Sequence, residues 1–241
     1  MLKKTTPFLV VSASLAFIAM FGCRTPELKE NGAPPSNIEK FDAAVDDDAG
    51  PGEFCPKGSL DLFNNAYSPY IGGEETIDMT VVDFSYFRCP HCAHCADMIR
   101  EIWTTNPTFK KRVRLYFHHF PFSNETAWKL HAATAAAGYQ GVEYFWAMHD
   151  YIYDGMALDS PKYYSVADLA DYAENVLQLD MDQWEFDRNQ ETNPDTYSYL
   201  QWDKAQAHAV GVSGTPSLFV CGKKINWSKL EAVVESYLNK N

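Results

Sequence analysis

The middle of the chain alternates between short apolar runs and a segment with helical spacing. Residues 76–87 (TIDMTVVDFSYF) and 113–120 (VRLYFHHF) are rich in β-branched and aromatic residues, as is typical of buried strands. Between them, from Pro90 onwards, apolar residues recur every three or four positions and predict an amphipathic helix that ends near Asn106. This close succession predicts a βαβ unit whose two strands are parallel neighbours.

A long helical region follows. Helical spacing extends from about residue 124 to residue 210, with breaks at Gly141, at the Ser-Pro pair 160–161 and at the Asn-Pro pair 193–194. The pattern predicts no strand in this region. We therefore expect a helical insertion between two groups of strands.

The last part of the chain returns to a strand pattern. Residues 216–220 (PSLFV) predict a strand, residues 221–222 a turn, and residues 224–226 a short edge strand. Ser228 and Glu231 match a capping box and predict that a final amphipathic helix starts there.

The N-terminus has the pattern of an export signal. Lys3 and Lys4 precede an uncharged apolar run, residues 8–21, which is too short to span a membrane. The run ends at a glycine followed by Cys23, which resembles a lipoprotein box, so residues 1–22 are predicted to be removed and Cys23 to be lipidated. An ordinary secretory signal or an uncleaved anchor would explain the same run.

Composition separates a tether from one globular domain. Residues 23–58 hold five prolines and three consecutive aspartates at 46–48, without sustained apolar periodicity, and predict a flexible acidic tether. The aspartates lack the spacing of a calcium loop. Residues 59–241 are long enough for one domain with an insertion.

Charge excludes one class of partner. The 20 Lys and Arg against 32 Asp and Glu give a net charge of −12, which argues against nucleic acid as a partner. Hydrophobic residues make up 46% and aromatic residues 15%, enough to build a core.

The candidate chemistry lies where the first strand meets the helix. Cys89, Pro90, His91 and Cys92 form a CPHC motif at the predicted helix N-terminus, with the proline at the first helical position. Unpaired N–H groups and the helix dipole favour a thiolate on Cys89 there. Cys92 lies one turn further in and suits a resolving role. In an exported chain, the motif indicates a redox-active centre.

A metal site is the alternative. Cys95 extends the motif to CPHCAHC, in which His91 and His94 are interleaved, so the chain would be a periplasmic copper- or zinc-binding protein. The spacing lacks the fourth ligand of an iron–sulfur cluster and the Cys-His of haem attachment. Cys95 otherwise reads as a buried apolar residue of the helix.

Two segments carry a family resemblance. VVDFSYFRCPHC, residues 81–92, and GVSGTPSLFV, residues 211–220, resemble the DsbA-like thioredoxin-fold thiol–disulfide oxidoreductases. The resemblance covers about residues 60–240. It implies an α/β, thioredoxin-like fold with a helical insertion between its βαβ and ββα halves.

The resemblance also implies roles for residues outside the CPHC motif. Pro216 would be cis after Thr215 and would hold a substrate segment by backbone pairing, and the position of a proline at a strand start or edge agrees. Asp83, six positions before Cys89, would be a buried acid that passes protons beneath the second cysteine. An exposed strand-end aspartate is the alternative. His91 would be a cation that stabilises the Cys89 thiolate.

The predicted function is thiol–disulfide exchange, without a cofactor, most consistent with an oxidase. The expected partners are cysteine-containing exported proteins and a redox partner that recycles the disulfide, and the expected location is the bacterial periplasm, on a membrane through the lipid anchor.

The remaining cysteines and aromatic residues are assigned more simply. Cys55, Cys95 and Cys221 are an odd number, and a Cys55–Cys221 bridge is one hypothesis for them. His118 and His119 alternate on a strand, so only one faces the site. The other histidines and the aromatic residues between 144 and 153 are interpreted as packing or surface groups.

Overall fold

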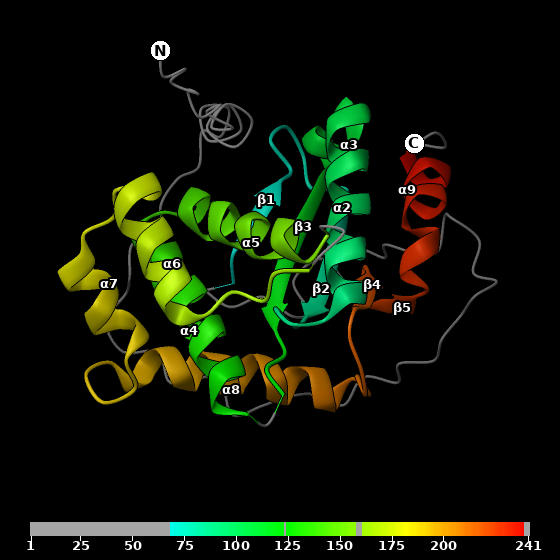
Figure 1. Ribbon diagram of the computed structural model, residues 1–241. Coiled ribbons are helices and arrows are strands. Elements are labelled where there is room, and N and C mark those ends of the chain that lie inside the picture. The colour runs from blue at the N-terminus through cyan, green and yellow to red at the C-terminus, as the bar shows by residue number, and fades with distance from the viewer. Residues whose placement is uncertain (1–67, 123, 158–160, 239–241) are drawn as a thin grey trace, which may run out of the picture.

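The computed structural model describes residues 68–122, 124–157 and 161–238. A five-stranded mixed sheet with strand order β1-β3-β2-β4-β5 forms its centre (Figure 1). The strands are β1 (Tyr70–Gly72), β2 (Met79–Ser85), β3 (Val113–His119), β4 (Ser217–Val220) and β5 (Lys223–Ile225). Only β2 and β3 pair in parallel, and the other neighbours are antiparallel.

The helices fall into three groups along the chain. Those of the βαβ half are α2 (Pro90–Thr105) and α3 (Pro107–Arg112). The insertion comprises α4 (Glu125–Gln140), α5 (Val142–Met156), α6 (Val166–Tyr172), the π-helical turn η3 (Ala173–Leu177), α7 (Met181–Arg188) and α8 (Pro194–Ala209). A 3₁₀ turn, η4 (Trp227–Lys229), leads into the last helix, α9 (Leu230–Leu238).

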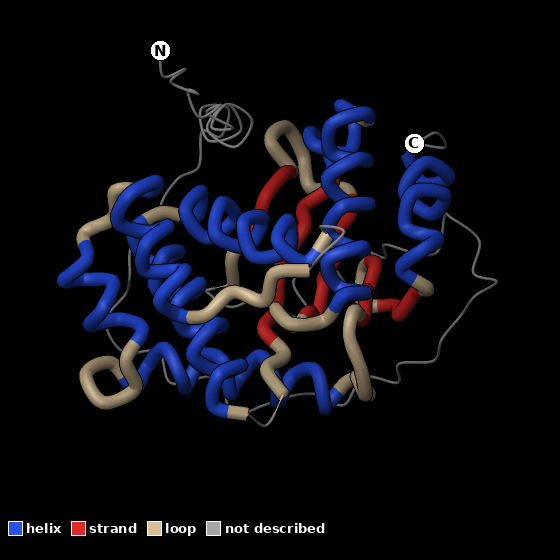
Figure 2. The backbone as a smooth tube through the Cα atoms, viewed as in Figure 1, coloured by secondary structure: helices blue, strands red, loops and turns tan. Residues whose placement is uncertain are grey.

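Alternation along β2 assigns its side chains to two cores. Val81 packs with α2 and α9 on one face of the sheet, in a core that includes Leu218 and Val234. Val82 packs on the other face with Phe219 and with residues at the end of α8. Side chains of the remaining insertion helices form a third cluster with Cys92, Ala93 and Ala96 of α2. Figure 2 shows the backbone of these helices beside the sheet. The insertion thus covers one end of α2, where the cysteines lie.

The predicted fold class is confirmed. A β2-α2-β3 unit and a β4-β5-α9 unit share one sheet, and the helical insertion lies between them in the chain (Figure 1). Val81 of β2 pairs with Leu115 of β3 in the predicted parallel arrangement. Helix α2 ends at Thr105, and the Asn106 side chain accepts the N–H groups of Thr108 and Phe109 to start α3.

One strand was not predicted, one prediction was confirmed in part and one was wrong. Strand β1 was not predicted, because three residues that end on a glycine carry no periodic signal. Pro216 stands directly before β4, at a strand start as predicted, but β4 lies between β2 and β5 and is not an edge strand. The final helix is preceded by a cap at Asn226, whose side chain accepts the N–H of Ser228; no Ser228–Glu231 capping box forms, because Ser228 already lies within the 3₁₀ turn.

The predicted signal peptide 1–22, the lipidation site Cys23 and the tether 23–58 with Cys55 lie outside the described residues. Across the described part of the chain, none of the helices combines the length and the hydropathy that a membrane crossing needs.

Gly72 ends β1 with φ at +83°, and a Cβ added there would lie 2.3 Å from the carbonyl oxygen of Val113. We expect Gly72→Ala to cost about 3 kcal/mol of unfolding free energy, because both the dihedral and a fixed backbone atom oppose the methyl group. Gly211→Ala is the matched control, since Gly211 also has positive φ but nothing lies within 4 Å of an added Cβ. It should cost about 1 kcal/mol. Equal losses in urea unfolding would contradict the clash.

Candidate active site

The turn after β2 places Cys89 at the cap of α2. Cys89 has extended dihedrals, φ −100° and ψ 115°, and its carbonyl accepts the N–H groups of Cys92 and Ala93 at 3.0 and 3.1 Å. Pro90 occupies the first helical position, where its missing N–H removes no hydrogen bond. The backbone N–H groups of His91 and Cys92 in this first turn also act on the Cys89 sulfur.

The two sulfurs of the motif differ in solvation. Cys89 is half-buried, whereas Cys92 has no exposed surface and packs with Phe87 and Phe117 in the core beside the insertion. Both are free thiols in this structure. Cys89 is thus the sulfur that a second protein can reach.

Local hydrogen bonds lower the pKa of Cys89 to about 5. The largest cause is the hydrogen bond from the side chain of Cys92, and the backbone N–H groups of Cys92 and His91 and the side chain of Thr215 add to it, while burial opposes them. The direction agrees with the thiolate that the sequence predicts at a helix N-terminus.

Burial acts in the opposite direction on Cys92. Desolvation is the largest cause that raises the pKa of this thiol, and the hydrogen bond to Cys89 and the charge of Asp83 raise it further. The pair therefore divides into a stable thiolate on Cys89 and a neutral thiol on Cys92.

The segment before β4 faces the same sulfur. The bond between Thr215 and Pro216 is cis, and the carbonyl oxygen of Thr215 lies 3.4 Å from Sγ of Cys89, which donates to it. The two regions are 126 positions apart in the sequence. The fold thus brings together the CPHC motif and the Thr-Pro pair that the sequence singled out separately.

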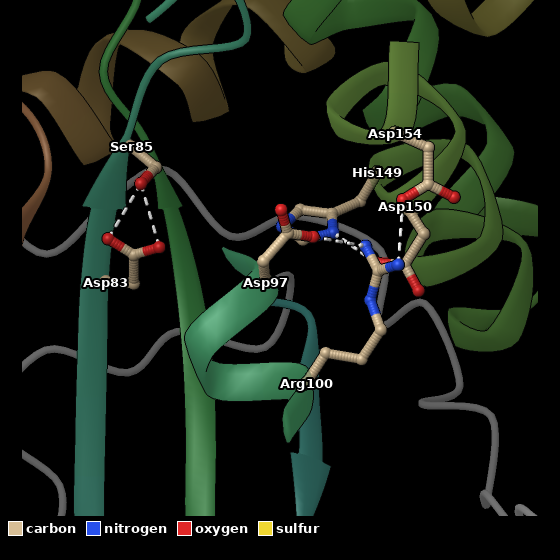
Figure 3. A network of polar contacts seen from close by, with 7 residues as sticks. All are labelled: Asp83, Ser85, Asp97, Arg100, His149, Asp150 and Asp154. Atoms are coloured by element: carbon tan, nitrogen blue, oxygen red, sulfur yellow. Dashed lines mark hydrogen bonds and ion pairs between the residues drawn. The ribbon is translucent and has the colours of Figure 1, made fainter. Parts of the chain in front are cut away.

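Asp83 is buried, with 3% of its surface exposed, so the exposed alternative is wrong. The Ser85 hydroxyl lies 2.7 and 2.8 Å from the two carboxyl oxygens of Asp83 and donates to them (Figure 3). Burial raises the pKa of Asp83 to about 7, against the Ser85 hydrogen bond, which lowers it. A carboxyl group whose pKa lies near 7 can accept and release protons at neutral pH, and the charge of Asp83 raises the pKa of Cys92.

His91 lies on the exposed surface of α2, directly after Pro90. Its backbone N–H is one of the groups that lower the pKa of Cys89, and the role of its imidazole as a cation stays a prediction. Arg88 lies over the ring of Tyr163, with its guanidinium carbon 5.5 Å from the ring centroid. The Cys92 side chain is therefore the main cause of the low pKa of Cys89, and the backbone N–H groups of the helix start add to it.

Cys95 is a buried apolar residue of α2, as predicted. It packs with Val81 and Leu218 against the sheet, whereas Cys92 belongs to the cluster formed with the insertion. Burial raises the pKa of the Cys95 thiol well above its usual value. Within the described ranges, no three His, Cys, Asp or Glu residues are grouped so that they could hold a metal ion. Cys221 is disulfide-bonded, and Cys55, its expected partner, lies outside those ranges.

A pair of buried histidines supports the active-site turn and was missed in the sequence. The N–H of Phe87 donates to Nε2 of His131 at 3.4 Å, and Nδ1 of His131 lies 2.8 Å from Nδ1 of His119. Burial lowers the pKa of His131 to about 3, so both rings stay neutral. His118 points to the opposite face and pairs with Asp203 at 2.9 Å. Only the alternation of the two strand histidines was visible in the sequence.

An arginine fixes the insertion to the catalytic helix. Arg100 of α2 lies 2.7 Å from Asp154 and 3.8 Å from Asp150, both on α5, and 3.5 Å from Asp97 on its own helix (Figure 3). Buried His149 bonds to Asp150 at 2.8 Å. These contacts hold α5 in register against α2, next to the buried sulfur.

Comparisons with known proteins agree with this arrangement. The family model described as Thioredoxin matches residues 64–240. The Na(+)/H(+) antiporter NhaA 1 of Salinispora arenicola is 32% identical over 175 residues, which are 69% of this chain but 24% of the antiporter. The chain thus spans about a quarter of that relative's length.

Two further proteins match over most of their length. The Probable disulfide bond formation protein D of Bacillus anthracis is 26% identical over 172 residues, which are 70% of this chain and 77% of that protein. A thioredoxin-like oxidoreductase from Silicibacter pomeroyi is 25% identical with a TM-score of 0.59, and the match covers 78% of this chain and 99% of that chain. The comparisons confirm the resemblance to thioredoxin-fold thiol–disulfide oxidoreductases.

The pKa of Cys89 gives a direct prediction. Thiolate absorbance near 240 nm in the reduced protein should titrate with a midpoint near pH 5, and Cys89→Ser should remove that transition. Because the folded pKa lies below the unfolded value of about 8.5, the thiolate stabilises the reduced protein fully above that value. This stabilisation is lost as the pH falls towards 5. Reduced and oxidised forms whose stability difference stays constant between pH 5 and 8.5 would contradict the assignment.

Proposed function

Because the chain belongs to the thioredoxin family, we propose that it is an enzyme that catalyses thiol–disulfide exchange through Cys89 and Cys92. The observation that carries the proposal is the inequality of the two sulfurs. Cys89 is accessible and its pKa is about 5, whereas Cys92, one helical turn away, is buried and its pKa is raised. Exchange needs one sulfur that meets the substrate and a second that resolves the mixed disulfide.

The exchange proceeds in two substitutions at sulfur. A substrate thiolate attacks Sγ of Cys89 in the disulfide form, the Cys89–Cys92 bond breaks, and Cys92 leaves as a thiolate that takes up a proton. A second substrate thiolate then attacks the substrate sulfur of the mixed disulfide, and Cys89 leaves as a thiolate. The substrate loses two electrons and the CPHC pair gains them.

Asp83 and the Thr215-Pro216 segment have supporting roles in this scheme. Asp83 supplies the proton to Cys92 when it leaves, and accepts it in the reverse direction, because its pKa of about 7 makes both forms available. The backbone of Thr215 lies beside Cys89, where it can pair with an extended substrate segment.

We assign the oxidase direction from the leaving-group argument. A low pKa on Cys89 stabilises the reduced form and makes it a good leaving group, and both effects favour donation of the disulfide. The name of the Bacillus anthracis relative, a disulfide bond formation protein, supports the same direction.

The location and partners follow from the N-terminal sequence. A signal peptide at 1–22, lipidation at Cys23 and a tether over 23–58 would hold the domain, residues 59–241, at a membrane surface in the bacterial periplasm. Its substrates there would be exported proteins with cysteines, and a separate redox partner would recycle the disulfide. The alternative, a copper or zinc carrier, has no support from the CPHCAHC geometry, since Cys92 and Cys95 point into different cores.

The redox equilibrium of the Cys89–Cys92 pair against glutathione tests the proposal. On metal-free mature protein, we expect one reversible two-electron transition near the oxidising end, at about −120 mV as in the most oxidising members of the fold. Thiol trapping at each glutathione ratio measures it. Cys89→Ser should abolish the transition, and Cys95→Ser should leave it in place.

Other outcomes have distinct meanings. A potential near −270 mV, about the value of thioredoxin, would contradict the oxidase direction but would still be consistent with thiol–disulfide exchange. If no reversible pair is found and the protein binds copper(I) or zinc in a way that Cys95→Ser weakens, the exchange proposal fails.

Asp83 gives a second prediction. Asp83→Asn should slow the step in which Cys92 gains or loses its proton by roughly hundredfold, because the exchanging carboxyl is gone. In the direction in which Cys92 is deprotonated, the wild-type rate should rise through pH 7 as Asp83 ionises, and the variant should lack this inflection. Asp203→Asn is the control, since Asp203 is also buried with a raised pKa but pairs with His118 on the other face. An unchanged inflection in Asp83→Asn would refute the role of Asp83.

A further inference from the structure

Ser85 of β2 carries a buried hydroxyl next to Asp83, and the exchange scheme gives it no role. Successive side chains of a strand point to opposite faces of a sheet, so Val81, Asp83 and Ser85 share one face. Val81 packs there in the cluster that contains Cys95 of α2. Asp83 and Ser85 therefore lie on the face of the sheet that α2 covers, and Ser85 has no exposed surface.

One hydroxyl serves both oxygens of the carboxyl group. Oγ of Ser85 lies 2.7 Å from Oδ1 and 2.8 Å from Oδ2 of Asp83, and it donates to them (Figure 3). Among the residues that the structure describes, no other group donates a hydrogen bond to this carboxyl. Hydrogen bonds to an ionised acceptor are stronger than those to a neutral one, so the contact favours the carboxylate over the acid.

The neighbouring elements offer the Asp83 carboxylate little other stabilisation. Burial and the charge of Cys89 oppose its ionisation, and His118 of β3, which pairs with Asp203 on the opposite face, acts together with Ser85. Strand β4 pairs with β2 here and brings no titratable side chain. The further titratable groups whose pKa the charge of Asp83 raises are Cys92 and Cys95 of α2 and Tyr153 of α5.

We propose that Ser85 is a positioning residue for proton transfer, whose hydroxyl holds the Asp83 carboxyl in place and keeps it ionised to accept the proton of Cys92. The inference deepens the proposed function and rests on it. A donor shared by both oxygens opposes rotation of the carboxyl group. Without this donor the buried acid would stay protonated over a wider pH range, and the base would be absent when Cys92 has to lose its proton.

The step concerned is closure of the disulfide in the reverse direction. The Cys92 thiol gives its proton to the Asp83 carboxylate, and the resulting thiolate attacks Sγ of Cys89 in the mixed disulfide. The Cys89–Cys92 bond forms, and the substrate sulfur leaves as a thiolate with the electron pair of the broken bond. The Ser85 hydroxyl keeps its own proton. Cys89 carries no charge in the mixed disulfide, so its effect on Asp83 is absent from the wild type and from Ser85 variants alike.

Ser85→Ala tests the proposal, because it removes the hydroxyl and little else. The rate of disulfide closure is measured against pH in the reduced protein with saturating peptide disulfide, where the attack of Cys92 limits the rate. We expect the inflection near pH 7 to move up by about 1–2 pH units, as for the loss of a hydrogen bond to a charged group. The rate at pH 7 should fall about fivefold or more, and well above the new inflection it should return to the wild-type value.

Two comparisons separate this role from a structural one. Thr196→Val removes a buried hydroxyl on α8 that donates to the carbonyl oxygen of Asp187 at 2.7 Å, and it should leave the inflection at the wild-type pH. In the Asp83→Asn background, Ser85→Ala should cause no further change, because Ser85 acts through Asp83. A rate lowered equally at every pH, or a further loss in the Asp83→Asn background, would refute the role of Ser85.

The failure of this inference differs from the failure of the proposed function. A wild type without exchange activity refutes the proposed function, whereas an active Ser85→Ala protein with an unmoved inflection refutes only the role of Ser85. Ser85→Thr keeps a hydroxyl at the same position and replaces Ser85→Ala if that variant does not fold. It should keep the wild-type inflection, and an inflection displaced upwards would contradict the proposal.

Discussion

The unequal solvation of two sulfurs on one helical turn is the constraint on which the rest of the structure depends. Cys89 caps α2, where the backbone N–H groups of His91 and Cys92 help to lower its pKa, and Cys92 lies inside the core. A charge is therefore favoured at one sulfur and disfavoured at the other, about one turn away. The sheet fixes the start of the helix, and the insertion closes the core around its second cysteine. Neither alone would create the difference.

The insertion does more than enlarge the domain. Its helix α5 is held to α2 by Arg100, supplies Tyr153 to the cluster that contains Cys92, and lies beside α4, whose His131 accepts an N–H from the active-site turn. Each contact joins residues that are far apart in sequence. His119, His131 and Tyr153 are polar side chains without charge on the buried side of the motif. A core of low dielectric constant tolerates such groups better than charged ones.

The sequence predicted those features that depend on residues close together in the chain. Periodicity located β2, α2 and β3, and the cap position of Cys89 followed from the proline after it. Contacts between distant segments were not predictable in this way. Strand β4 pairs with β2 and β5, and this pairing depends on how the two halves of the fold meet. Asn226, and not Ser228, provides the cap because a 3₁₀ turn precedes the helix. His131 has ordinary helical spacing, so only its contacts with Phe87 and His119 distinguish it from a packing residue.

The separation of Cys92 from Cys95 limits the states that the domain can store. Three thiols within seven residues allow three pairwise bonds, yet the helix directs Cys92 towards the insertion and Cys95 towards the sheet. Joining these two would require both cores to open. Oxidation of this helix therefore cannot be diverted into a Cys92–Cys95 bond while the domain stays folded, and Cys89 is the partner that remains for Cys92.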